Sequence, residues 1–165
     1  MYRMKERAFE TIVIRPCWKY YVLNMGWLAL LSMALLFIGG MEGIRFYLPL
    51  YIASGVIGAF ALYQFFYLKK IIFLVTGEQL IIQRGVFLRT WDYIELYRII
   101  DFTEHQNLLQ QLVGLKVVTI HSTDRTNPRL QLMGIPREKD IVRLIRERVI
   151  YNRSIRNIHE FSNLI

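Results

Sequence analysis

Residues 22–68 read VLNMGWLALLSMALLFIGGM (22–41), EGIR (42–45) and FYLPLYIASGVIGAFALYQFFYL (46–68), and this stretch decides the fold. Neither apolar segment contains a charged side chain. A bilayer core about 30 Å thick is crossed by about 20 helical residues, each of which rises about 1.5 Å. Because the four residues between the segments only allow a direct reversal, the sequence predicts a helical hairpin that crosses a membrane twice, through 22–41 and 46–68.

The alternative is a pair of helices buried inside a soluble protein. The chain has 165 residues, of which 54% are hydrophobic. A soluble domain of this size could hardly cover two charge-free helices on all sides. The composition therefore favours the membrane interpretation.

The basic residues beside the hairpin predict its orientation. Lys19 precedes the first segment and the pair Lys69-Lys70 follows the second, whereas Arg45 in the turn is balanced by Glu42. Lys and Arg near a membrane are retained on the cytoplasmic side. We therefore expect a multi-pass protein with both termini in the cytoplasm. The net charge of +8 follows largely from this bias and from attraction to anionic lipids, so no nucleic-acid partner is predicted.

Two polar side chains interrupt the apolar segments. Asn24 lies near the start of the first and Gln64 near the end of the second, which places them at a similar depth in a hairpin. We expect them to form a polar pair, and a hydrogen bond between them would contribute about 0.6 kcal/mol.

The sequence pattern changes after residue 68. Short runs of β-branched and aromatic residues are then separated by turn residues, which is typical of antiparallel strands. The predicted strands cover 70–76, 79–84, 86–91, 93–100, 115–122 and 129–134. A short helix is expected over 103–113, because Thr103 followed by Gln106 resembles a capping box and Gly114 can end it. After Pro136 an apolar stripe predicts an amphipathic helix: Ile141, Val142, Leu144, Ile145 and Val149.

The predicted organisation has four parts: a cytoplasmic amphipathic leader (1–21), the hairpin (22–68), a cytoplasmic domain of strands closed by a helix (69–150), and a tail without an assigned role (151–165).

Several of these runs resemble the membrane-flanked bacterial pleckstrin-homology (PH) family, formerly a domain of unknown function. The pieces are T-x-x-x-L over 76–80 with Gly85, I-x-L-x-R-I over 94–99, and Gln106 with the following helix and Gly114. The resemblance implies an α+β membrane protein: a transmembrane hairpin followed by a PH-like domain of two orthogonal antiparallel sheets closed by a C-terminal helix. It also implies the bacterial inner membrane as the location.

The resemblance also indicates where to look for ligands, because eukaryotic PH domains that bind inositol phosphates use basic residues around the first hairpin turn. We assign that turn to 76–79, which contains no Lys or Arg. Other basic residues beside the membrane or near turns are the candidate contacts for lipid or a protein partner: Lys69, Lys70, Arg84, Arg89, Arg125 and Arg129.

Nothing in the sequence indicates catalysis. No HExxH, GxSxG or phosphate-binding glycine loop is present. Asp101, Glu104 and His105 lie close in sequence, but adjacent residues point in different directions and do not make a dyad by spacing alone. The single cysteine, Cys17, excludes an internal disulfide. We predict no catalytic residue, no metal site and no cofactor.

The predicted function is a non-enzymatic scaffold that presents its PH-like domain at the membrane for protein binding or self-assembly. The first alternative is recognition of anionic lipid head groups by the basic residues. The second is a membrane-bound enzyme without a recognisable motif.

Overall fold

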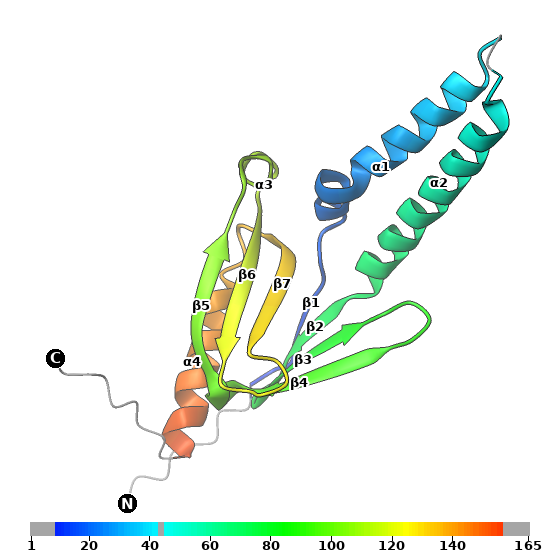
Figure 1. The fold of residues 1–165 in the computed structure, drawn as a ribbon. Helices are drawn as coiled ribbons and strands as arrows, with labels where there is room; N and C mark the ends of the chain where they lie inside the picture. The colour runs from blue at the N-terminus through cyan, green and yellow to red at the C-terminus, as the bar shows by residue number, and fades with distance from the viewer. Residues whose placement is uncertain (1–8, 43–44, 157–165) are drawn as a thin grey trace, which may run out of the picture.

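The structure is a computed structural model that describes residues 9–42 and 45–156 (Figure 1). Its elements are β1 (Ile12–Ile14), α1 (Trp18–Gly39), α2 (Tyr47–Lys70), β2 (Ile72–Val75), β3 (Gln79–Arg84), β4 (Thr90–Glu95), a 3-10 turn (Leu96–Arg98), β5 (Ile99–His105), α3 (Leu108–Val113), β6 (Leu115–Ser122), β7 (Arg129–Pro136) and α4 (Ile141–Ile155). The strands form two antiparallel sheets, β1-β2-β3-β4 and β5-β6-β7. The predicted α+β class, with two apolar helices, two antiparallel sheets and a C-terminal helix, is confirmed.

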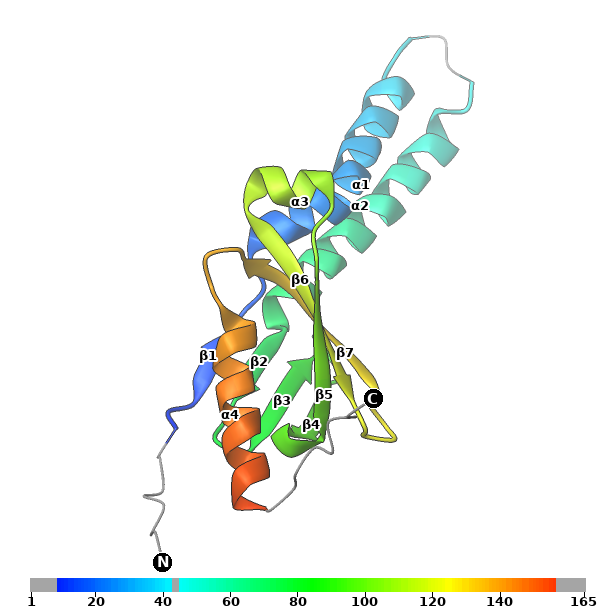
Figure 2. The same ribbon diagram turned by 90° about the vertical axis from the view of Figure 1, so that its left-hand side faces the viewer.

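α1 and α2 pack against each other and extend away from the sheets (Figures 1 and 2). Only 11% of the most apolar window of each helix is buried, whereas a core helix of a soluble protein is mostly covered. Both helices are long and apolar enough to cross a membrane. Ser32 and Ser54 join them, because each hydroxyl donates to the other residue's carbonyl oxygen at 3.0 and 2.8 Å.

The segment before the hairpin is not the separate leader that we predicted, because part of it belongs to the first sheet. Residues 12–14 form β1, an edge strand that pairs antiparallel with β2 in the register Ile12↔Val75 and Ile14↔Phe73. Ile14 is buried in the core, and its contribution to that core explains why so short a strand is held. The helical hairpin therefore lies inside the connection between two neighbouring strands (Figure 1). Residues 1–8 of the predicted leader lie outside the described residues.

Three other segments differ from the sequence prediction. Residues 93–100, expected to form one strand, are divided among β4, the 3-10 turn and β5. Residues 86–89, expected to start a strand, belong to the β3–β4 loop, which Gly85 opens with φ 108°. Residues 103–105, expected to start a helix, pair with β6 as part of β5. The capping box is instead formed by Asn107 and Gln110. Gly114 ends α3 in the left-handed conformation, as predicted.

The core lies between the two sheets and α4. Its largest fully buried side chains come from both sheets and from the helix: Phe73, Leu80, Ile82, Ile94, Leu96, Ile99, Leu115, Ile120, Leu132, Ile135, Ile141 and Ile145. From the predicted stripe of α4, Ile141, Ile145 and Val149 are buried, Val142 is partly buried against the core, and Leu144 is 37% exposed. α4 continues into the predicted tail as far as Ile155, and residues 157–165 lie outside the described part of the chain.

Candidate functional site

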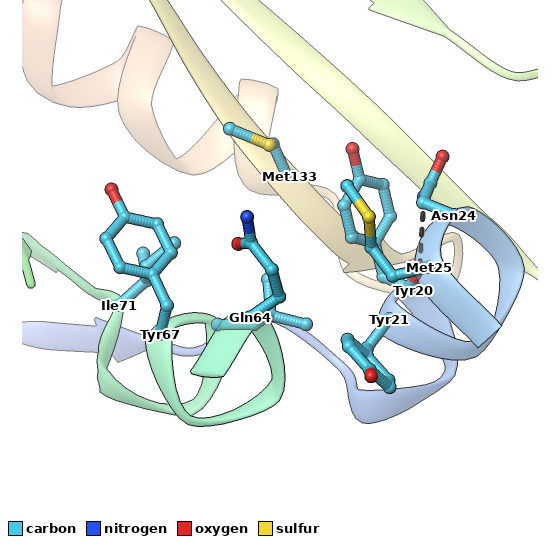
Figure 3. A pocket seen from close by; sticks show the side chains of 9 residues that line it. Tyr20, Tyr21, Asn24, Met25, Gln64, Tyr67, Ile71 and Met133 are labelled. Atoms are coloured by element: carbon cyan, nitrogen blue, oxygen red, sulfur yellow. Dashed lines mark hydrogen bonds between the residues drawn. The ribbon is translucent and has the colours of Figure 1, made fainter. Parts of the chain in front are cut away.

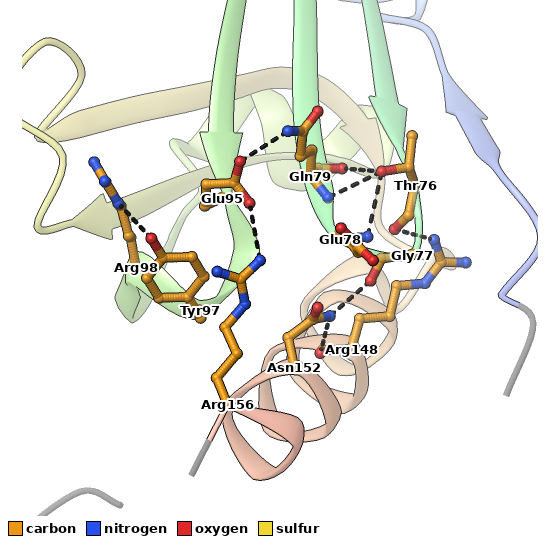
Figure 4. A network of polar contacts seen from close by, with 10 residues as sticks. All are labelled: Thr76, Gly77, Glu78, Gln79, Glu95, Tyr97, Arg98, Arg148, Asn152 and Arg156. Carbon is orange, nitrogen blue, oxygen red and sulfur yellow. Dashed lines mark hydrogen bonds and ion pairs between the residues drawn. The ribbon is translucent and has the colours of Figure 1, made fainter. Parts of the chain in front are cut away.

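A buried arginine on α4 ties three segments of the domain together, and Figure 4 shows its contact with Thr76. Nη1 of Arg148 donates to the carbonyl oxygens of Val75 and Thr76 at 2.6 and 2.7 Å, and Nη2 donates to the carbonyl oxygen of Glu10 at 2.7 Å. Asn152, one turn later, donates to the carbonyl oxygen of Gly77 at 2.6 Å. Burial lowers the pKa of the Arg148 guanidinium from its usual value. Since these hydrogen bonds go to backbone carbonyl oxygens, we interpret Arg148 as a structural residue.

The order in which the strands pair corrects our assignment of the first hairpin turn. Residues 76–79 join β2 to β3, whereas the first paired strands are β1 and β2. The connection equivalent to a first hairpin turn is therefore residues 15–71, which include α1 and α2. The turn at 76–79 is fixed by Thr76, whose hydroxyl accepts a hydrogen bond from the amide of Gln79 at 2.9 Å. It faces Arg148 and Asn152 and serves the packing of α4.

The outer face of the first sheet carries an apolar row. Successive residues of a strand point to opposite faces, so the buried residues Phe73, Leu80 and Ile94 define the inner face. The register then aligns four residues on the outer face, one from each strand: Val13, Leu74, Ile81 and Tyr93. We call these four residues the outer row.

The outer row is exposed at its two ends, and Leu74 and Ile81 between them are half-buried. Val13 is 50% exposed and Tyr93 is 56% exposed, and on the adjacent row of the same face Trp91 is 47% exposed. The second sheet and α4 pack on the opposite, inner side (Figure 1). Contiguous apolar surface of this kind marks contact sites for other proteins or membranes.

A cavity of about 220 Å³ lies where the helical hairpin meets β7 (Figure 3). Gln64 and Tyr67 of α2 lie on one side of it and Tyr20 and Asn24 of α1 on the other, with Met133 of β7 between them. Asn24 and Gln64 thus line one cavity. The structure records no hydrogen bond between them, and the side-chain amide of Asn24 instead donates to the Tyr20 carbonyl oxygen at 3.0 Å within its own helix.

Four of the six predicted basic residues lie at the end of the domain nearest the hairpin. Lys69 and Lys70 end α2, and Nζ of Lys69 lies 4.6 Å from the centroid of the Phe65 ring. Arg89 is exposed in the β3–β4 loop. Arg84, in contrast, forms an ion pair with Asp92.

The other two basic residues lie elsewhere. Arg125 is in the β6–β7 loop and Arg129 begins β7, at the end of the second sheet opposite α3 (Figures 1 and 2). Both are exposed. The structure therefore does not bring all six basic residues into one site.

The acidic residues near His105 do not converge with it. Glu104 accepts a hydrogen bond from Nζ of Lys116 at 2.8 Å, and Asp101 accepts one from the amide of Phe102 at 2.7 Å. In residues 9–42 and 45–156, no group of three or more His, Cys, Asp and Glu side chains is placed to hold a metal ion.

Comparison with known proteins identifies the family. The sequence profile described as "Bacterial PH domain" matches residues 25–149, which is most of the chain. Neither a curated protein nor a solved structure is significantly similar to the chain. The matched range includes most of the helical hairpin, both sheets from β2 onward and the greater part of α4, in agreement with the predicted resemblance. The chain therefore belongs to the bacterial PH domain family.

Proposed function

We propose that this chain is a non-enzymatic, multi-pass protein of the bacterial inner membrane that presents its PH domain to a protein partner at the cytoplasmic surface. The membrane part is supported by the length, composition and exposure of α1 and α2. The pairing of β1 with β2 keeps the two ends of the helical hairpin on one side. The flanking residues Lys19, Lys69 and Lys70 favour the cytoplasm as that side.

The junction between helices and domain supports presentation at a fixed orientation. Ile71 is the single residue between α2 and β2, and it is buried. On the other side of the hairpin, the backbone amide of Cys17 donates to the carbonyl oxygen of Gly134 at 2.9 Å. Because both connections are short and packed, the domain has little freedom to swing relative to the helices.

The observation that carries the proposal is the outer row. Its four residues form an apolar strip across the whole width of the first sheet, and Trp91 widens it. Partially exposed aromatic residues of this kind are enriched at protein interfaces. The partner is either another protein or a second copy of this chain.

The test compares the full-length chain with Tyr93→Lys and with the control Ile150→Lys. Ile150 is 62% exposed on α4, so its substitution adds the same charge outside the proposed interface. Native mass measurement in mild detergent and pull-down from solubilised membranes report the dimer and any bound protein. We expect the wild type and Ile150→Lys to form a dimer or to recover a bound protein. We expect Tyr93→Lys to lose that dimer or bound protein.

Two results would contradict the proposal. One is a wild-type chain that is monomeric and recovers no partner. The other is an assembly that survives Tyr93→Lys unchanged. Thermal unfolding of each variant separates loss of the interface from loss of the fold.

A second candidate function is recognition of anionic lipid head groups, favoured by the positions of Lys69, Lys70 and Arg89 near the base of the helical hairpin. Substituting all three with Gln should reduce the fraction of anionic lipid that copurifies with the full-length chain. Equal anionic lipid content in wild type and variant would reject it.

A further inference from the structure

The β3–β4 loop forms an apolar tip beside α2. Phe87 and Leu88 are each 87% exposed at the end of this loop. The loop is nevertheless positioned, because the ring of Phe87 stacks on Tyr63 of α2 with centroids 6.4 Å apart and planes 8° apart. Gly85 shapes the turn with φ 108°, and a Cβ at that position would lie 1.8 Å from the carbonyl oxygen of Leu88.

α3 forms a second apolar tip beside α1. Leu108 and Leu112 are 79% and 83% exposed, and Leu109 is 54% exposed. Val113 of α3 lines the same hollow as Trp18 and Leu23 of α1. In Figures 1 and 2, α3 stands at the end of β5 and β6 that lies nearest α1.

The contacts of both tips fix their level along the helical hairpin. Tyr63, which holds Phe87, lies seven residues before Lys70, which is about 10 Å along the helix axis at a rise of about 1.5 Å per residue. Leu23, beside α3, lies four residues after Lys19, or about 6 Å. Tyr63 therefore falls within the charge-free part of α2, and the α1 residues beside α3 run from Trp18 through Lys19 to Leu23, across the start of the charge-free part of α1. Both contacts thus lie at the level where head groups give way to hydrocarbon.

From this shared level we infer that the PH domain is seated on the bilayer through both tips: Phe87 and Leu88 enter the lipid interface on one side of the helical hairpin, and Leu108 and Leu112 enter it on the other. The occupant is lipid because the tips continue the lipid-facing surface of α1 and α2. Arg89 follows Leu88 in the β3–β4 loop and Lys69 lies at the end of α2, and such basic residues are expected at an anionic surface. The inference rests on the membrane-spanning part of the proposed function and is independent of the outer row.

The test measures the depth of each tip directly. Cys17 is first replaced by Ser, and single cysteines are then introduced as Leu88→Cys, which keeps the contact of Phe87 with Tyr63, and Leu112→Cys in the full-length chain. Val56→Cys on α2, where the native side chain is 65% exposed, is the reference for a lipid-embedded site, and Ile150→Cys on α4 is the reference for a site in water. Each protein carries a nitroxide label in vesicles of phosphatidylethanolamine and phosphatidylglycerol.

Collision of the label with oxygen, which concentrates in lipid, is compared with collision with a water-soluble nickel complex. We expect the oxygen-to-nickel ratio at 88 and 112 to shift toward the ratio at 56 and away from that at 150. A ratio at 88 and 112 equal to that at 150, with 56 still lipid-embedded, overturns the inference while the hairpin remains in the membrane. Low collision with both reagents also overturns it, because protein then covers the tips. If 56 itself is exposed to nickel, the membrane-spanning proposal fails and the inference falls with it.

Discussion

Replacing Arg148 by Met should loosen the segment before the hairpin from the domain. The substitution keeps an apolar stem but removes three hydrogen bonds, to the carbonyl oxygens of Val75, Thr76 and Glu10. A hydrogen bond to a charged group contributes about 1.5–3 kcal/mol, but the cost of burying the guanidinium offsets part of this gain. In the variant, the partly buried carbonyls of Thr76 and Glu10 can bind water instead. We therefore expect a net loss of about 2–4 kcal/mol, most of which comes from the buried Val75 carbonyl.

Hydrogen exchange of the full-length chain in detergent micelles can measure this loss segment by segment. Exchange over residues 9–16 and 76–79 should accelerate by at least about 30-fold, because about 1.4 kcal/mol corresponds to a factor of ten. The matched control is Arg143→Met on the same helix, where the guanidinium is 72% exposed and its ion pairs contribute little. An acceleration below about threefold, or an equal one in the control, would refute the assigned role of Arg148.

Two further substitutions test the helical hairpin and the β3–β4 loop. Ser54→Ala removes the hydroxyl that donates to the Ser32 carbonyl oxygen. We expect this to destabilise the pairing of α1 with α2 by about 0.6–1.7 kcal/mol, measured by unfolding in bicelles. An unchanged free energy of unfolding would contradict a stabilising role for the contact. Gly85→Ala places a Cβ against the Leu88 carbonyl oxygen and should lower the free energy of unfolding by about 1–3 kcal/mol, measured in a thermal scan. The control is Gly77→Ala, whose added Cβ would lie 3.8 Å from the Cβ of Phe9. This control should change the free energy of unfolding little.

The helical hairpin and most strands were predictable because their signals are local. The charge-free segments 22–41 and 46–68 correspond to α1 and α2, and the run 115–122 coincides with β6. Length and composition decide such elements without reference to the rest of the chain. The buried stripe of α4 was predictable for the same reason, since it repeats at the helical period.

The missed features depend on contacts between distant residues. β1 has three residues, and its partner β2 lies beyond both helices, so no local pattern reveals the pairing. The capping boxes at 103–106 and 107–110 look alike in sequence, and only the pairing of 103–105 with β6 decides between them. The loop residues 86–88 read as a strand because they are apolar, yet they form an exposed tip.

The outer row was missed for a related reason. It requires the register of four strands before its members align. A partial signal was present, because Trp91 and Tyr93 alternate with Asp92 and Ile94 on β4. Among the predicted basic residues, the sequence likewise could not tell that Arg84 would be paired with Asp92.

The position of β1 ahead of the helical hairpin has a consequence for biosynthesis. As the chain leaves the ribosome, β1 is made before α1 and α2, but its partner β2 appears only after both. In the proposed membrane topology, the first sheet can be completed only when the two helices have returned the chain to its starting side, so insertion with the wrong topology would leave β2 with an open edge. Unpaired edges promote aggregation. In that topology, completion of the PH domain would report correct insertion, and a truncated chain that starts at residue 70 would lack β1.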